Sequence, residues 1–221
     1  MTTRILLGDA LARLKELPTA SVHLAVTSPP YLGQRDYKTP GQIGSERTWE
    51  EHLAALLAVF REVARVLRPD GLLWVNYGDK YVGGDLGDAG LGLADKNLMG
   101  LPFRLVMALQ AEGWYWRAVC PWVKRNGLPD SASDRPGINL EWLFQLGHPQ
   151  SGGRSYYDPE AVRVSHTAGT HSRGGVKKDN TGHDAGSKKG GWNELPPTQN
   201  PAGRSRRMGD WWVESMREIV G

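Results

Sequence analysis

The sequence predicts one α/β domain followed by a basic, loop-rich segment, and three features of the chain support this. Short apolar runs alternate with helical apolar stripes over residues 1–150, which is typical of an α/β sheet. Glycine accounts for 28 of the 221 residues, which indicates long loops. Residues 151–207 carry ten Lys and Arg against five Asp and Glu, although the net charge of the chain is only +3. We therefore expect a folded domain over 1–150, a basic DNA-recognition segment over 151–207 and a tail over 208–221 that returns to the core.

Apolar periodicity and turn residues predict the elements of the first domain. Thr48 and Glu51 form a capping box that starts a helix, and Pro69-Asp70-Gly71 ends it. Because strands and helices alternate, a parallel or mostly parallel sheet is expected. The expected strands cover residues 4–7, 22–27, 72–76, 114–123 and 140–146, and the expected helices cover residues 11–17, 48–68 and 101–111.

Composition excludes several classes of protein. A single cysteine, Cys120, rules out a disulfide framework and a cysteine-based zinc cluster, and its strand position predicts a small buried apolar residue. The longest apolar run, residues 53–60, is too short to cross a membrane, and no leader opens the chain. We therefore expect a soluble cytoplasmic protein. No metal site is expected, because four histidines fall in loops at uneven spacing and read as surface residues: His148, His166, His171 and His183.

The sharpest motif is Ser28-Pro29-Pro30-Tyr31, which directly follows the apolar run of residues 22–27. Proline lacks a backbone N–H, so this stiff loop presents carbonyl oxygens beside a serine hydroxyl and an aromatic ring. Such a loop is suited to holding a planar amine by both of its N–H groups. A proline turn that closes a strand, or a short polyproline ligand, is the plainer alternative.

At these residues the chain resembles the amino-group DNA methyltransferases of the β group, in which the catalytic loop precedes the cofactor loop. The resemblance runs in order through nearly the whole chain, although only the catalytic loop is a strong signal alone. Its other parts are Gly8-Asp9-Ala10-Leu11, Arg65 to Leu73, Asn97 to Pro102, Gly113-Trp114, Trp122-Val123-Lys124, Asp134-Arg135-Pro136, Tyr156-Tyr157-Asp158, and Gly203 to Arg207 with Trp211-Trp212.

The resemblance implies a Rossmann-like class I methyltransferase sheet and S-adenosyl-L-methionine as the methyl donor. The acceptor is the exocyclic amino group of a flipped base, with cytosine N4 favoured over adenine N6. It assigns catalysis to Ser28, Pro29, Pro30 and Tyr31, and the cofactor contacts to Asp9 and Ala10. Asp9 also reads as the N-cap of the helix that follows it.

Double-stranded DNA is the expected partner, and the basic segment supplies its phosphate contacts. The alternative interpretation is that this basic segment is a solvated surface loop. The candidate contacts are Lys177, Lys178, Lys188, Lys189, Arg204, Arg206 and Arg207.

The chain departs from the family in lacking the Phe-x-Gly-x-Gly loop that cradles the methionine part of the cofactor. We therefore expect a truncated product or half of a split enzyme, which binds S-adenosyl-L-methionine poorly unless a second chain or a homodimer completes the site. Two further hypotheses about the function remain open. One is a catalytically incomplete DNA-binding fragment or subunit, and the other is an amide or RNA methyltransferase.

Overall fold

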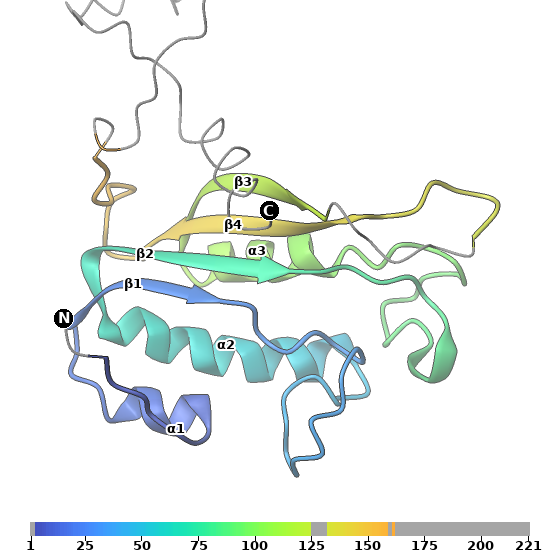
Figure 1. The fold of residues 1–221 in the computed structure, drawn as a ribbon, viewed down its shortest axis with the longest axis horizontal. Coiled ribbons are helices and arrows are strands. Elements are labelled where there is room, and N and C mark those ends of the chain that lie inside the picture. The colour runs from blue at the N-terminus through green and yellow to red at the C-terminus, as the bar shows by residue number, and fades with distance from the viewer. Residues whose placement is uncertain (1–2, 125–131, 159–160, 162–221) are drawn as a thin grey trace, which may run out of the picture. The chain divides into compact units, whose positions relative to one another are not determined.

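Four strands form one mixed sheet in the computed structural model, which describes residues 3–124, 132–158 and 161 (Figure 1). The strand order is β1-β2-β4-β3, with β1 parallel to β2 and with β4 antiparallel to both β2 and β3. The elements in chain order are α1 (Ala10–Lys15), β1 (Val22–Thr27), α2 (Trp49–Val66), β2 (Leu67–Tyr77), the 3₁₀ turn η1 (Gly84–Leu86), α3 (Leu101–Ala111), β3 (Tyr115–Val123) and β4 (Leu140–Gly147).

The sheet is mixed, so the expectation of a mostly parallel sheet is wrong. β3 and β4 follow one another in the chain and pair antiparallel from Tyr115↔Gly147 to Val123↔Leu140. Antiparallel strands need only a loop between them, whereas parallel neighbours need a crossover, which α2 supplies between β1 and β2. The missing helix signal between residues 123 and 140 could therefore have identified the reversal.

Helices α2 and α3 cover the same face of the sheet. Alternate residues of β2 point to this face and are fully buried, as are Leu56 of α2 and Leu105 of α3. Each such side chain contributes about 1.5–3 kcal/mol of transfer free energy. This shared core fixes the carboxyl ends of β1 and β2 side by side.

The boundaries of α2 follow its local chemistry. The Thr48 hydroxyl accepts a hydrogen bond from the Glu51 amide at 3.2 Å, and the Glu51 carboxylate accepts one from the Thr48 amide at 3.4 Å, so the capping box is confirmed. β2 begins immediately after the helix, five residues earlier than expected. Pro69 is accommodated because the ladder between β1 and β2 is irregular there, between the pairs Val22↔Leu67 and Leu24↔Leu72.

The expected strand over residues 4–7 is wrong. Residues 3–9 form no strand, and the side chains of Ile5 and Leu7 are 85% and 91% exposed. Apolar run length predicted a strand, but a strand needs a neighbour to satisfy its backbone groups. Among the described residues, these positions have none.

The chain divides into two compact units, Met1–Tyr156 and Tyr157–Gly221. Nearly all of the second unit lies outside the described residues, so the boundaries expected at residues 150 and 207 stay predictions. Within the described part of the chain, no helix is both long enough and apolar enough to cross a membrane.

Candidate active site

The Ser28–Tyr31 loop leaves β1 at the carboxyl edge of the sheet, where open α/β sheets bind ligands. Ser28 is exposed, Pro29 is buried, and Pro30 and Tyr31 are half-buried. Because β1 runs parallel to β2, with Thr27 paired to Val75, the residues that end β2 lie beside this loop. The loop is thus anchored on one side and open at its serine.

Asn76, near the end of β2, joins three groups of this site. Its Nδ2 donates to Glu141 Oε2 at 2.6 Å and to the Tyr31 hydroxyl at 3.0 Å, and it lies 3.4 Å from Ser28 Oγ. Its other polar atom, Oδ1, is buried and has no hydrogen-bond partner among the described residues. A buried acceptor without a partner is costly, so Asn76 holds the loop and still has one acceptor to offer.

Glu141, at the start of β4, is the ionised acceptor of the cluster. Its Oε1 pairs with Lys124 Nζ, and its Oε2 accepts from the Tyr31 hydroxyl at 3.0 Å. Burial acts to raise the pKa of Glu141, but hydrogen bonds from Lys124, Asn76 and Tyr31 outweigh it and hold the pKa below its ordinary value. Burial, and then the Glu141 charge, raise the pKa of Tyr31, so the phenol stays neutral and donates.

The Tyr31 ring is fixed as firmly as its hydroxyl. Its centroid lies 4.6 Å from that of Tyr77, with the two ring planes 39° apart. Gly78 lies so close that a Cβ built on it would be 2.9 Å from Tyr31 Cε2. Tyr31 is therefore held against the end of β2 by its ring and by its hydroxyl.

Asn76 and Glu141 are site residues that sequence reasoning missed. Asn76 had a usable signal, since a polar residue at the carboxyl end of the strand next to a motif-bearing strand is a candidate site residue. Glu141 had none, because its place depends on the antiparallel pairing of β4 with β2.

Asp9 is the N-cap of α1, as expected. Its Oδ1 accepts a hydrogen bond from the Ala12 amide at 2.9 Å, and both Asp9 and Ala10 are exposed. Their expected contacts with the cofactor stay a prediction. All seven basic residues expected to contact DNA lie outside the described residues, and so do His166, His171 and His183.

Cysteine and metal chemistry have little support in the described part of the chain. Cys120 is half-buried in β3, and burial raises the pKa of its thiol, which disfavours the nucleophilic thiolate. Across residues 3–124, 132–158 and 161, no group of three His, Cys, Asp or Glu side chains could hold a metal ion.

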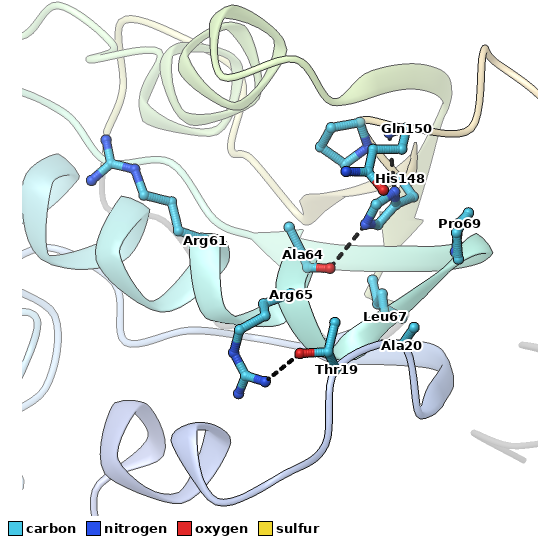
Figure 2. A pocket seen from close by; sticks show the side chains of 10 residues that line it. Thr19, Ala20, Arg61, Ala64, Arg65, Leu67, Pro69, His148 and Gln150 are labelled. Carbon is cyan, nitrogen blue, oxygen red and sulfur yellow. Dashed lines mark hydrogen bonds between the residues drawn. The ribbon is translucent and has the colours of Figure 1, made fainter.

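A cavity of about 340 Å³ lies at the opposite end of the sheet, where β2 begins (Figure 2). The side chains of Arg61, Arg65 and His148 that line it are paired within the protein. Arg65 donates to Thr19 Oγ1 and to two backbone carbonyls, and Arg61 pairs with Glu112. His148, expected at the surface, is buried here with Nε2 2.9 Å from the Ala64 carbonyl oxygen, while its Nδ1 accepts from the Gln150 amide. This cavity therefore belongs to the framework of the fold.

The molecule is thus an α/β protein whose Ser28–Tyr31 loop lies beyond a parallel strand and is held by the next strand. The family model described as DNA methylase (N6_N4_Mtase) matches residues 22–212. The chain therefore belongs to this DNA methylase family, and the resemblance noted in the sequence is confirmed.

Curated bacterial proteins show the same relationship. The chain is 43% identical over 179 residues to the type II methyltransferase M.Cfr9I of Citrobacter freundii, covering 73% of this chain and 59% of that protein. It is 41% identical over 198 residues to M.XycI of Xanthomonas campestris pv. cyanopsidis, covering 81% of this chain and 65% of that protein. The chain thus spans about three fifths of the length of these relatives.

One solved structure supports the fold class. The PvuII DNA methyltransferase, described as cytosine-N4-specific, superposes with a TM-score of 0.55 at 21% identity, covering 70% of this chain and 51% of that one. The Rossmann-like methyltransferase sheet expected from the sequence is therefore confirmed.

Proposed function

We propose that this protein transfers a methyl group from S-adenosyl-L-methionine to the exocyclic amino group of a base extruded from double-stranded DNA, as one part of a restriction-modification system. The observation that carries this proposal is the Ser28–Tyr31 loop, which is open at Ser28 and held at Tyr31 by Asn76 and Glu141. Family membership supports the same chemistry. With DNA as its substrate, the protein is also proposed to act in the cytoplasm.

Ser28 and Pro29 hold the amino group in this proposal. The Ser28 hydroxyl oxygen and the Pro29 carbonyl oxygen accept its two N–H bonds, which leaves the nitrogen lone pair aimed at the methyl group. Asn76 Oδ1, which is buried and has no partner in the described part of the chain, is a further acceptor at the same edge. Formation of the new N–C bond would go with cleavage of the S–C bond of the donor, and the proton lost from the amino group would pass to solvent.

Tyr31 supports the base by stacking. One side of its ring packs against Tyr77, and its hydroxyl is committed to Glu141, so a base can meet only the remaining face. A ring fixed in this way stabilises a stacked base without paying to order its own side chain.

Asp9 and Ala10 fit part of a cofactor site, because they are exposed and only one Asp9 oxygen, Oδ1, has a hydrogen bond among the described residues. The second oxygen, Oδ2, can accept an N–H or O–H of the cofactor's adenosine. The bound cofactor supplies an electrophilic methyl group on a sulfonium, and the protein contributes its orientation.

The unpaired edge of β1 supports the proposal that a segment of a partner completes the enzyme. Among the described residues, only β2 pairs with β1, and Leu24 and Val26 are 51% and 67% exposed on the face away from α2. Exposed apolar residues on an unpaired edge strand are a typical docking surface for another strand. We propose that a segment carrying the glycine loop, supplied by a second and different chain, docks there.

The basic segment provides the DNA phosphate contacts in this proposal. Neutralising Lys188 and Lys189 together lowers DNA affinity and flattens its dependence on salt by about two units of slope. Titrations of duplex DNA at several salt concentrations measure this, and an unchanged slope removes both lysines from the interface.

Cytosine N4 is the favoured acceptor, as in the name of the structurally similar PvuII enzyme. The test is to incubate the chain with labelled S-adenosyl-L-methionine and duplex DNA, with and without a polypeptide that carries the glycine loop, and to identify the methylated nucleoside. N4-methylcytosine is expected. N6-methyladenine would overturn the choice of base. DNA binding without transfer in either mixture would favour the non-catalytic DNA-binding role, and transfer to RNA or protein alone would overturn DNA as the substrate.

A further inference from the structure

A buried series of hydrogen-bonded polar groups lies behind the Ser28–Tyr31 loop, and the proposed chemistry does not use it. It starts at Glu46, passes through His52 of α2 and Tyr77 of β2, and ends at the backbone amide of Leu32, the residue after Tyr31. The His52 side chain is fully buried, with Nδ1 2.8 Å from Glu46 Oε2 and Nε2 2.8 Å from the Tyr77 hydroxyl. The Leu32 amide donates to the same hydroxyl at 3.2 Å.

Counting donors favours one direction for these bonds, the one in which every donor of the four groups has an acceptor. A backbone N–H can only donate, so the Tyr77 oxygen accepts from Leu32. The single hydroxyl proton of Tyr77 is then free to go to His52 Nε2, which must be unprotonated to receive it. The proton of the neutral imidazole therefore sits on Nδ1 and is donated to Glu46 Oε2, which can only accept.

An imidazolium would break this order. Its Nε2–H would donate to the Tyr77 oxygen, which already accepts from Leu32, and the phenol proton would lose its acceptor. Burial lowers the pKa of His52, against the opposing effect of the Glu46 carboxylate, which is consistent with a neutral ring.

Both ends of this series of hydrogen bonds lie against the Ser28–Tyr31 loop. The Tyr77 ring packs against the Tyr31 ring, so the position of its hydroxyl also sets the support beneath Tyr31. At the other end, Glu46 Oε2 also accepts from the Gly44 amide at 2.7 Å, and the Gly44 carbonyl accepts from the Gly33 amide at 2.8 Å. A Cβ built on Gly44 would lie 3.0 Å from the Tyr31 carbonyl oxygen, so Gly44 is pressed against the back of the loop.

We propose that His52, as the neutral Nδ1–H tautomer, is a positioning residue for the Ser28–Tyr31 loop and acts through the Tyr77 hydroxyl on the Leu32 amide. This inference deepens the proposed function, because it assigns a support to the same loop. His52 touches neither base nor cofactor in this arrangement. Its effect is to hold the acceptors of Ser28 and Pro29 where an amino group meets them.

The first test reads the tautomer in the unmodified chain. Nitrogen NMR of the 221-residue protein, with the ring resonances assigned to His52, is expected to show a protonated Nδ1 and an unprotonated Nε2 near neutral pH. A protonated Nε2, alone or in an imidazolium, would overturn the proposal without the need for any variant.

The second test compares two substitutions that differ in which ring nitrogen they replace. The amide oxygen of His52→Gln can reach the place of Nε2 and accept from Tyr77, whereas His52→Asn can replace only Nδ1. Hydrogen exchange at the Leu32 amide is expected to rise about tenfold in His52→Asn and in Tyr77→Phe, and to stay near the original rate in His52→Gln. Amides of α3 serve as the internal control for global unfolding. Equal exchange in the Asn and Gln variants would contradict the proposal.

Methyl transfer gives the functional side of the same test. His52→Asn and Tyr77→Phe are each expected to lower kcat about tenfold with little change in KM for DNA, and the double variant is expected to be no worse than Tyr77→Phe alone. Additive losses would show that the two residues act separately. They would overturn the proposal that His52 acts through the Tyr77 hydroxyl. These rates are measured in the presence of the polypeptide that carries the glycine loop. Failure of the unmodified protein to transfer methyl groups in that mixture would count against the proposed function only, because Leu32 exchange reports loop position without the reaction.

Discussion

Asn76 does more for the candidate site than its single amide suggests. It reaches Ser28, Tyr31 and Glu141 from one nitrogen, so its loss frees the loop and leaves Glu141 with fewer donors. We expect Asn76→Ala to lower the rate of methyl transfer at least tenfold, since misplacing acceptors by a fraction of an ångström removes orientation. Asn97→Ala, at an exposed amide whose bond among the described residues is to the Ala94 carbonyl, is the matched control and should change little. Equal effects of the two variants on the transfer rate would contradict this role of Asn76.

The buried imidazole of His52 predicts an acid-sensitive fold. Glu46 and Tyr77 are the titratable groups bonded to the ring, and Trp49 packs beside it. Burial holds the pKa of His52 below its ordinary 6.5, so the unfolded chain binds the proton more readily. This contribution to stability is complete above about pH 6.5 and is lost as the pH falls through the lowered pKa of the folded protein.

His52→Gln should therefore weaken the pH dependence of stability. Urea unfolding at about pH 7.5 and about pH 5.5 measures the free energy in both proteins, and the decrease between the two pH values should be smaller in the variant. An identical decrease in both proteins would show that His52 is not the group responsible.

Among the elements, α3 depends on a carboxylate from outside the helix. Asp79, just after β2, accepts from the amides of Gly100 and Leu101 at 3.0 and 3.1 Å, and so caps the helix that begins at Leu101. Asp79→Ala is expected to cost about 1–2 kcal/mol of stability. Asp85→Ala removes an exposed carboxylate from the turn η1 and should stay within about 0.5 kcal/mol. Urea unfolding distinguishes them, and equal midpoints and slopes would contradict the capping role.

Elements with local signals were predictable, and those set by their neighbours were not. The capping box of Thr48 and Glu51 located the start of α2, and the apolar run of residues 22–27 gave β1 its observed bounds. The apolar run of residues 4–7 carried an equal signal but found no partner. His148 was expected at the surface because its loop is polar, yet the Ala64 carbonyl and the Gln150 amide satisfy both ring nitrogens in a buried place.

Only part of the candidate site was likewise predictable from the sequence. The Ser28–Tyr31 loop was predictable because a rare tetrapeptide follows an apolar strand. Its supports, Asn76, Glu141 and His52, come from β2, β4 and α2, and only the sheet pairing and helix packing bring them together. Long-range partners of this kind leave no short pattern in a sequence.

At the scale of the whole molecule, the unpaired edge of β1 predicts dependence on another segment. Replacing Leu24 and Val26 together with lysine should leave the chain folded, because both side chains are already exposed, and should weaken binding of a polypeptide carrying the glycine loop at least tenfold. Met107→Lys, at an exposed apolar position on α3, is the control and should bind normally. Calorimetry measures both affinities, and equal binding by the two variants would place the docking surface elsewhere.

The central claim is that the Ser28–Tyr31 loop holds the amino group that receives the methyl. Transfer of label from S-adenosyl-L-methionine to duplex DNA, in the presence of the completing polypeptide, tests it most directly in the original protein and in Ser28→Ala. Because Ser28 is exposed in a loop, the variant should keep its fold. The account predicts label on an exocyclic amino nitrogen and a loss of at least a hundredfold in rate for Ser28→Ala, on the scale of removing one preorganised polar contact at a reacting centre. An undiminished rate in that variant, or label at a ring carbon, would contradict it.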